Sequence, residues 1–194
     1  MREFLLVILL LISHHVYSQL RDSVIVKNDV FEIIYSEKLE GPIRILYDVQ
    51  CTKSVFSRKG LDFYTPDSIR TSNSEDYLNN IYDKGHMAPA ADFNCDSFKL
   101  RKTFSYVNCS PQNQFLNRGV WRLLEEYERT LKMKYKKVSV EIIPKYTEKS
   151  IKLETGAVVP DGYTKIITSG KTIMKFYFPN SRPYSNDYMI YLVK

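Results

Sequence analysis

Apolar residues along this chain fall in short runs that are separated by turn-forming residues. Residues 30–35 and 43–49 have strand composition, and Gly-Pro at 41–42 predicts the turn of an antiparallel hairpin between them. The apolar run at 104–109, which Ser-Pro-Gln at 110–112 interrupts, predicts another strand. Further strands are predicted in the C-terminal part, at 138–143, 151–159, 165–168, 174–178 and 188–193.

One segment has a different period. From about residue 113 to residue 133, apolar side chains recur at three- and four-residue steps, which predicts an amphipathic helix. Its apolar positions are Leu116, Val120, Leu123, Leu124, Tyr127 and Leu131. Strands, one central helix and then more strands predict an α+β domain with a mainly antiparallel sheet. The turn-rich, charged stretch at 56–82 predicts a long surface connection, and loops of that length are usually functional.

The N-terminus has the features of a removable secretory leader. A short charged start is followed by an apolar run at 4–12, and small residues precede a predicted cut after Ser18. The run is shorter than the roughly 20 residues that span a bilayer, and no later stretch is long enough. We therefore expect a secreted or periplasmic protein without a membrane anchor, in which residues 19–194 form a single domain. An uncleaved anchor or a buried helix is the alternative.

Charge and cysteine content narrow the function only slightly. A net charge of +6 is compatible with nucleic acid, an anionic glycan or a lipid surface as partner, and equally with solubility alone. Cys51, Cys95 and Cys109 form an odd set, so one disulfide with a free thiol and three buried thiols both remain open. Cys109 lies in an apolar run, where a small buried residue is the default.

His86 is the only histidine outside the predicted leader, because His14 and His15 both lie within it. One imidazole can act as a general base near neutral pH. Asn117 and Glu125 lie eight residues apart on one stripe of the predicted helix, roughly 12 Å along its axis. Helical side chains lean towards the N-terminus, so Asn117 could bind an ion and Glu125 its waters, which suits Mg²⁺. On spacing alone, a surface asparagine and a solvated glutamate are the commoner interpretation.

Three motifs resemble the DNA/RNA non-specific endonuclease family of ββα-metal nucleases. They are Asp83-Lys84-Gly85-His86-Met87-Ala88-Pro89, Asn108-Cys109-Ser110-Pro111-Gln112, and Asn117-Arg118-Gly119-Val120-Trp121 with Glu125 further along the helix. The family signature is Asp-Arg-Gly-His before a small residue and Pro, then Asn-x-x-Pro-Gln, then Asn-x-x-x-Trp with a later Glu. The resemblance is strong over residues 82–128. It implies a ββα-metal (His-Me finger) fold, with the histidine on a strand and the asparagine on a central catalytic helix.

The resemblance also implies a role for each motif residue. His86 would be the general base that activates water, and Asn117 would be the only direct protein ligand of Mg²⁺, which Mn²⁺ could replace. Glu125 would orient the water bound to the metal. Asn108 would position His86 or the phosphate neighbourhood, and Asp83 would support the turn that holds His86.

This chain departs from the family pattern at two basic positions. Lys84 stands where the family has Arg, which keeps the charge but loses the planar, bidentate grip on phosphate. The family also has an upstream Arg, for which Arg58 is the candidate, with Lys59 close behind. We predict that Lys84, Arg58 and Lys59 contact substrate phosphates, with Lys84 and Arg58 also part of the catalytic site. An ordinary solvated loop charge is the alternative for Arg58 and Lys59.

The family resemblance implies an endonuclease that hydrolyses phosphodiester bonds of DNA and RNA with Mg²⁺ and leaves 5′-phosphate ends. Contacts with the phosphodiester backbone would explain a weak sequence preference. Two alternatives stay open. A non-catalytic nucleic-acid-binding relative is suggested by Lys84, and a hydrolase of other phosphodiesters would use the same chemical groups.

Overall fold

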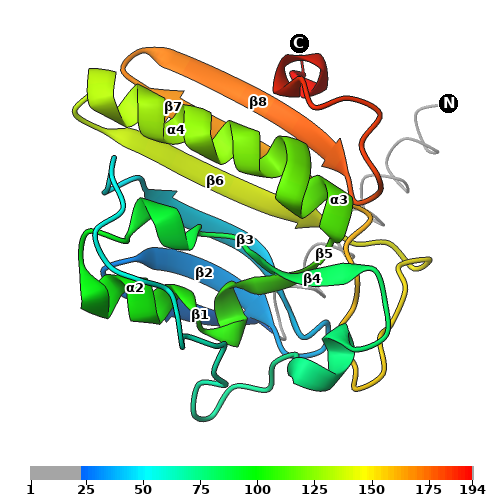
Figure 1. The fold of residues 1–194 in the computed structure, drawn as a ribbon. Coiled ribbons are helices and arrows are strands. Elements are labelled where there is room, and N and C mark those ends of the chain that lie inside the picture. The colour runs from blue at the N-terminus through cyan, green and yellow to red at the C-terminus, as the bar shows by residue number, and fades with distance from the viewer. Residues whose placement is uncertain (1–22, 194) are drawn as a thin grey trace, which may run out of the picture.

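A computed structural model describes residues 23–193 and shows a large sheet with helices along one of its faces (Figure 1). The sheet has the order β1-β2-β3-β6-β7-β8, and every neighbouring pair is antiparallel. Its strands are β1 (Ser23–Lys27), β2 (Phe31–Ser36), β3 (Gly41–Asp48), β6 (Val138–Lys145), β7 (Gly162–Ser169) and β8 (Thr172–Pro179). This architecture confirms the predicted α+β class and the mainly antiparallel sheet.

A second, two-stranded sheet pairs β4 (Tyr82–His86) with β5 (Cys109–Asn113), with His86 opposite Cys109. The chain passes from β5 directly into α3 (Gln114–Leu116), a π-helical turn (Asn117–Trp121) and α4 (Arg122–Lys134). The two strands and the helical segment thus follow one another in the order strand, strand, helix. The chain between the two strands contains a shorter helix, α2 (Ser97–Thr103). Single 3-10 turns occupy Ser74–Tyr77, Ala90–Asp92, Tyr106–Asn108 and Tyr188–Tyr191.

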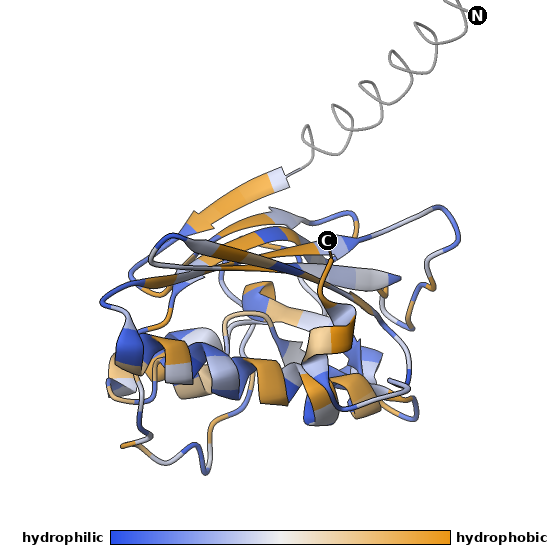
Figure 2. Cartoon of the chain, turned by 90° about the horizontal axis from the view of Figure 1, so that it is seen from above, coloured by the Kyte–Doolittle hydropathy of each residue, from blue (hydrophilic) through white to orange (hydrophobic). Residues whose placement is uncertain are grey.

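The core lies between the large sheet and the helix layer. Alternate residues of β2 and β6 are buried, as expected for strands with one covered face. Seen from above, the helices run along a single face of the sheet (Figure 2). Trp121 is fully buried and packs on Tyr163 and Phe178 at ring-centroid distances of 5.4 and 5.6 Å. Of the predicted apolar helix positions, Leu116, Val120, Leu124 and Leu131 are buried in the same core.

Two predictions about the N-terminal half are wrong in detail. The hairpin turn lies at 37–40, because Ser36 Oγ accepts a hydrogen bond from Leu39 N and Glu40 adopts a positive φ of 47°. Gly41-Pro42 instead begins β3 beside a register irregularity of β2. The predicted strand at 104–109 is a 3-10 turn followed by the start of β5, and β5 includes the residues predicted to break it.

Three further segments differ from the prediction, and in two of them a side chain caps a helical turn. The unpredicted α2 is capped by Asp96, whose carboxylate accepts hydrogen bonds from Phe98 N and Lys99 N. The predicted strand at 188–193 begins instead as a 3-10 turn capped by Asp187. The predicted strand at 151–159 contains only one isolated bridge, between Lys152 and Val158. The predicted leader and its cleavage site lie outside residues 23–193, and within this range no helix is long and apolar enough to cross a membrane.

Candidate active site

One cleft collects most of the residues that the motifs single out. Its volume is about 480 Å³. One wall is formed by the end of β4 and the residues after it, another by the π-helical turn with α4, and a third by the loop that precedes β4. It is lined by Ser54, Arg58, His86, Pro89, Ala90, Ala91, Asn117, Arg118, Arg122, Glu125, Glu126 and Arg129. The structure therefore brings His86, Asn117 and Glu125 together with Arg58.

His86 ends β4 at a point where two backbones come unusually close. A Cβ on Gly85 would lie 2.6 Å from the Gln112 side chain and 3.0 Å from the Ser110 carbonyl oxygen, so β4 and β5 approach only because residue 85 is glycine. The imidazole of His86 packs on Phe63 and Phe104, at ring-centroid distances of 4.6 and 4.8 Å. These two rings fix the plane of the imidazole at the cleft.

The electrostatic environment keeps His86 neutral. Burial, and to a smaller extent the nearby charge of Arg58, lower the pKa of His86 to about 3. Its Nε2 is buried and has no hydrogen-bond partner among the described residues. A neutral imidazole retains a lone pair at physiological pH, which is the state that a general base requires.

Asn108 holds the backbone that follows His86. Its carbonyl oxygen accepts a hydrogen bond from Met87 N (2.9 Å), and its side-chain oxygen accepts one from Ala88 N (2.8 Å). Its amide nitrogen donates to the carbonyl oxygens of Ala88 and Thr103, each at 2.9 Å. The side chain is fully buried and does not line the cleft, so its geometry suits the predicted role of positioning His86.

Asn117 lies in the π-helical turn, where Gly119 departs from helical geometry with φ −100° and ψ −118°. Its amide nitrogen donates to Asp83 Oδ2 at 2.9 Å, and Arg118 also donates two hydrogen bonds to the Asp83 carboxylate. The side-chain oxygen Oδ1 of Asn117 makes no hydrogen bond with any residue of 23–193, and the side chain lines the cleft. Asp83 thus leaves the amide oxygen available to a ligand, and π-turns are frequent at functional sites.

Glu125 lines the same cleft two turns further along the helix. Burial raises the pKa of the Glu125 carboxyl to about 7, although the positive charge of Lys165 acts in the opposite direction. At neutral pH this carboxyl is therefore divided between its protonated and ionised forms. A cation beside it would favour the ionised form.

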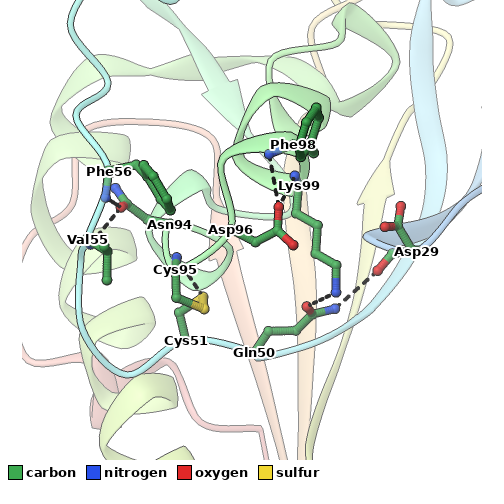
Figure 3. The surroundings of a disulfide bond; sticks show 10 residues. All are labelled: Asp29, Gln50, Cys51, Val55, Phe56, Asn94, Cys95, Asp96, Phe98 and Lys99. Carbon is green, nitrogen blue, oxygen red and sulfur yellow. Dashed lines mark hydrogen bonds between the residues drawn. A yellow bond between two sulfur atoms is a disulfide. The ribbon is translucent and has the colours of Figure 1, made fainter.

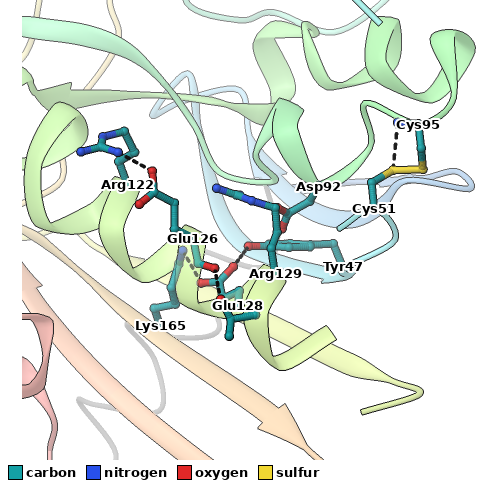
Figure 4. Close-up of polar contacts among 10 residues, drawn as sticks. Tyr47, Cys51, Asp92, Cys95, Arg122, Glu126, Glu128, Arg129 and Lys165 are labelled. Atoms are coloured by element: carbon teal, nitrogen blue, oxygen red, sulfur yellow. Dashed lines mark hydrogen bonds and ion pairs between the residues drawn. A yellow bond between two sulfur atoms is a disulfide. The ribbon is translucent and has the colours of Figure 1, made fainter. Parts of the chain in front are cut away.

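A buried ionic network supports the helix beneath this cleft (Figure 4). Lys165 Nζ and Glu128 Oε1 lie 2.8 Å apart with both side chains fully buried, and Tyr47 donates to Glu128 Oε2 at 2.9 Å. Arg129 pairs with the buried Asp92 at 2.8 Å. Burial raises the pKa of Asp92 well above its ordinary value, whereas the hydrogen bond from Arg129 opposes that shift. The network fixes the rotation of α4 about its axis.

The donor set fits a hydrated hard cation better than a metal held only by protein. Within residues 23–193, no three His, Cys, Asp or Glu side chains gather in a metal-binding group. The cleft instead presents the amide oxygen of Asn117 and the carboxylate of Glu125. Mg²⁺ accepts few protein oxygens and keeps several waters, so this pair suits it.

Two of the predicted phosphate contacts lie outside this cleft. Lys84 Nζ is 3.2 Å from Asp62 Oδ1 and lies near the rings of Phe63 and Tyr106. Lys59 is exposed on the loop but, like Lys84, is not among the lining residues. Of the three predicted phosphate contacts, the structure brings only Arg58 to the cleft.

The sequence reasoning missed three other arginines of the cleft. Arg118, Arg122 and Arg129 line it together with Glu125. Their spacing of four and then seven residues places them on the same helical stripe as Glu125, so the signal was present in the sequence.

A disulfide holds the loop that carries Arg58 (Figure 3). Cys51 and Cys95 are bonded, and Asn94 Oδ1 accepts hydrogen bonds from Val55 N and Phe56 N. Cys109 is a free, buried thiol. The structure therefore selects one of the two alternatives that the sequence left open, a single bridge and one free cysteine.

The arrangement defines a class of protein. A histidine at the end of a strand faces a helix that presents an asparagine and a glutamate, in a ββα unit of the ββα-metal nuclease type. The family model for DNA/RNA non-specific endonucleases matches residues 12–190, which is most of the chain. The chain belongs to this family of metal-dependent nucleases, as the motifs predicted.

Known proteins similar to this chain agree with that assignment. Mitochondrial endonuclease G of Bos taurus is 33% identical over 43% of this chain and 29% of its own length. The mitochondrial nuclease of Saccharomyces cerevisiae is 30% identical over 56% of this chain and 42% of its own length. The chain thus spans less than half of the length of these relatives. A crystal structure of an EndoG/EndoGI complex matches with a TM-score of 0.76 at 24% identity, covering 88% of this chain and 80% of the other, which supports the fold.

These comparisons contradict the predicted secreted or periplasmic location. The similar curated nucleases from cattle, zebrafish, baker's yeast and fission yeast are all named as mitochondrial. Their names give no support to export. An apolar, weakly charged start is therefore an insufficient basis for assigning a compartment.

Proposed function

We propose that this chain is a Mg²⁺-dependent endonuclease that hydrolyses phosphodiester bonds of DNA and RNA without regard to the sugar and leaves 5′-phosphate ends. The observation that carries the proposal is the shared cleft of His86, Asn117 and Glu125, which is bordered by arginine side chains. A base and a cation-binding pair on opposite walls meet the requirements of phosphodiester hydrolysis. Contacts with the backbone rather than with base edges would give little sequence preference.

Each residue has a distinct part in this reaction. His86, neutral because its pKa is about 3, takes a proton from the attacking water. The side-chain oxygen of Asn117 would hold the cation, because Asp83 accepts a hydrogen bond from the amide nitrogen and so leaves the oxygen free. Glu125 would hold water molecules of the same cation. When bound, the cation would stabilise negative charge on the phosphorus-bound oxygens and on the leaving group.

The arginines would bind and orient the substrate. Arg58 lies close enough to His86 to affect its pKa, so a phosphate that pairs with Arg58 would lie beside the base. A bound phosphate would also offset the charge of Arg58, which raises the pKa of His86 towards a more effective value. Arg122 pairs with Glu126, four residues further along the helix, and both line the cleft.

The test is degradation of supercoiled plasmid, single-stranded DNA and RNA by the purified protein over a range of Mg²⁺ and Mn²⁺ concentrations. We expect cleavage of all three substrates by the wild type and a loss of at least 100-fold for His86→Ala. The ends should be substrates for a ligase that requires 5′-phosphate. Equal cleavage by wild type and His86→Ala would remove His86 from the mechanism.

A non-catalytic nucleic-acid-binding protein is the second candidate, because Lys84 replaces the family arginine and pairs with Asp62 outside the cleft. A protein of this second kind would bind oligonucleotides in a salt-dependent manner but would cleave none of the three polymers. Hydrolysis of bis(p-nitrophenyl) phosphate without cleavage of polynucleotides would instead indicate a hydrolase of smaller phosphodiesters.

A further inference from the structure

A second hollow of about 390 Å³ adjoins the candidate active site. It lies on the other side of Arg118, which lines both cavities. Its walls come from α3 with the π-helical turn and from the chain after β8, and Figure 1 shows the chain after β8 passing beside α3. The lining residues used below are Phe115, Arg118, Gly119, Arg182 and Asn186.

The chemistry of this hollow is that of a stacking site. Phe115 is 45% exposed, and among the described residues it shares such exposure with Phe56, Phe98 and Tyr184. The guanidinium of Arg182 lies 4.0 Å from the centroid of the Phe115 ring. Exposed aromatic faces beside arginine are typical of proteins that bind single-stranded nucleic acid, because bases stack on the ring and the guanidinium contacts base or phosphate.

The two walls pack closely at a glycine. A Cβ on Gly119 would lie 3.1 Å from Asn186 Oδ1, tighter than ordinary contact, so the chain after β8 approaches the π-helical turn at residue 119. This approach places Arg182 on the same side of the helix as Arg118, whose guanidinium is already oriented by Asp83. The two hollows therefore lie in a row along one basic surface.

We propose that the hollow at Phe115 and Arg182 is a subsite for the base of a nucleotide that flanks the scissile phosphate. The subsite rests on the proposed function, because its occupant is the strand held in the neighbouring cleft. Stacking is available to every base, so the subsite adds affinity without sequence preference. It also favours substrates whose flanking base is unpaired, since a base within a duplex cannot reach the ring.

The first experiment measures binding in the His86→Ala background by fluorescence anisotropy of labelled oligothymidylates of two to eight nucleotides. We expect Phe115→Ala to weaken binding of the longer oligonucleotides about tenfold, and Phe115→Trp to retain it. Phe98→Ala is the matched control, because Phe98 is an exposed aromatic on α2 that lines neither cavity. It should bind as tightly as the parent.

A second arm separates stacking from charge. An oligonucleotide with an abasic site at the flanking position should bind the parent protein as weakly as Phe115→Ala binds the intact oligonucleotide. With this abasic ligand, the Phe115→Ala substitution should cause no further loss of affinity. Arg182→Ala should weaken binding and reduce the slope of log K against log salt by about 0.7 if the arginine contacts phosphate. An Arg182→Ala slope equal to that of the parent would assign Arg182 to the base instead.

The outcomes distinguish this subsite from the proposed function. Cleavage by the wild type together with unchanged oligonucleotide affinity for Phe115→Ala would overturn the subsite alone. Absence of cleavage together with Phe115-dependent binding would overturn the nuclease proposal and leave the subsite in place. Thermal unfolding of each variant shows whether a loss of affinity reflects a loss of folding.

Discussion

The amide nitrogen of Asn117 donates a 2.9 Å hydrogen bond to Asp83 Oδ2, which joins the strand that ends in His86 to the helix that carries the predicted metal ligand. One contact therefore fixes the position of both walls of the cleft and the orientation of the amide oxygen. Mutation of a partner that orients a metal ligand typically lowers metal affinity or activity by about 10- to 100-fold.

Asp83→Ala should raise the Mg²⁺ concentration for half-maximal activity by on the order of tenfold. The amide of Asn117 would then be free to rotate, so its oxygen would face the cation for only part of the time. A magnesium titration of plasmid cleavage measures the shift. Asp62→Ala is the control, since Asp62 is an exposed carboxylate that pairs with Lys84 outside the cleft. An equal shift in both variants would argue against the orienting role.

The activity at limiting Mg²⁺ should fall as the pH drops through about 7, the value to which burial raises the pKa of Glu125. Only the ionised carboxylate attracts the hydration shell of a cation, so protonation and cation binding compete. Excess Mg²⁺ should move this acidic limb to lower pH. Glu125→Gln should abolish the limb and lower the activity at every pH. A limb that persists in Glu125→Gln belongs to another group.

The raised pKa of Glu125 also predicts how the stability of the folded protein depends on pH. Because the pKa of Glu125 is higher in the folded than in the unfolded protein, the folded state binds more protons between about pH 4.5 and 7. The contribution of this residue to the free energy of unfolding should therefore decrease as the pH rises through that window. Glu125→Gln should remove this decrease. Urea unfolding without divalent ions at pH 5 and pH 8 measures the difference between the two proteins.

The site was easier to predict than the fold around it. Histidine, asparagine and glutamate at their motif spacings located the cleft, because the pairing of β4 with β5 and the helical segment that directly follows β5 fix their relative positions. Lys84 and Lys59 were predicted to contact phosphate because the family has arginines at or near these positions, yet Lys84 pairs with Asp62. The direction of a long basic side chain depends on tertiary partners that lie far away in the sequence.

The failures among the strands have a related cause. The segment at 104–109 is apolar because it is buried between the two sheets, and burial does not distinguish a strand from a 3-10 turn. Asn108 decides the conformation there, since its side chain binds the backbone of Ala88 and Thr103. A long-range contact of this kind leaves no periodic signal in the sequence.

Reduction of the Cys51–Cys95 disulfide should weaken substrate binding more than it slows the chemical step. The bond and Asn94 hold the loop that carries Arg58, whereas His86 and Asn117 depend on other contacts. Closure of a loop with a sequence separation of 44 stabilises the folded state by roughly 4 kcal/mol in the chain-entropy model. We expect KM to rise and kcat to change little in Cys51→Ser/Cys95→Ser. Cys109→Ser is the control for the loss of a cysteine outside the disulfide. An unchanged KM in the double variant would show that the disulfide-held loop does not contribute to substrate binding.

Lys165→Met should cost about 3–5 kcal/mol of unfolding free energy, because it leaves the carboxylate of Glu128 buried without its ion-pair partner. Lys165→Met/Glu128→Gln should recover much of that loss, since no unpaired charge remains. The charge of Lys165 also lowers the pKa of Glu125, so its removal should move the acidic limb of activity to higher pH. Urea unfolding and a pH–rate profile measure the two effects independently. Lys175→Met, an exposed position on β8, provides the matched control and should change neither. A pH profile of Lys165→Met that coincides with that of the wild type would show that the buried pair supports the fold without influencing the cleft.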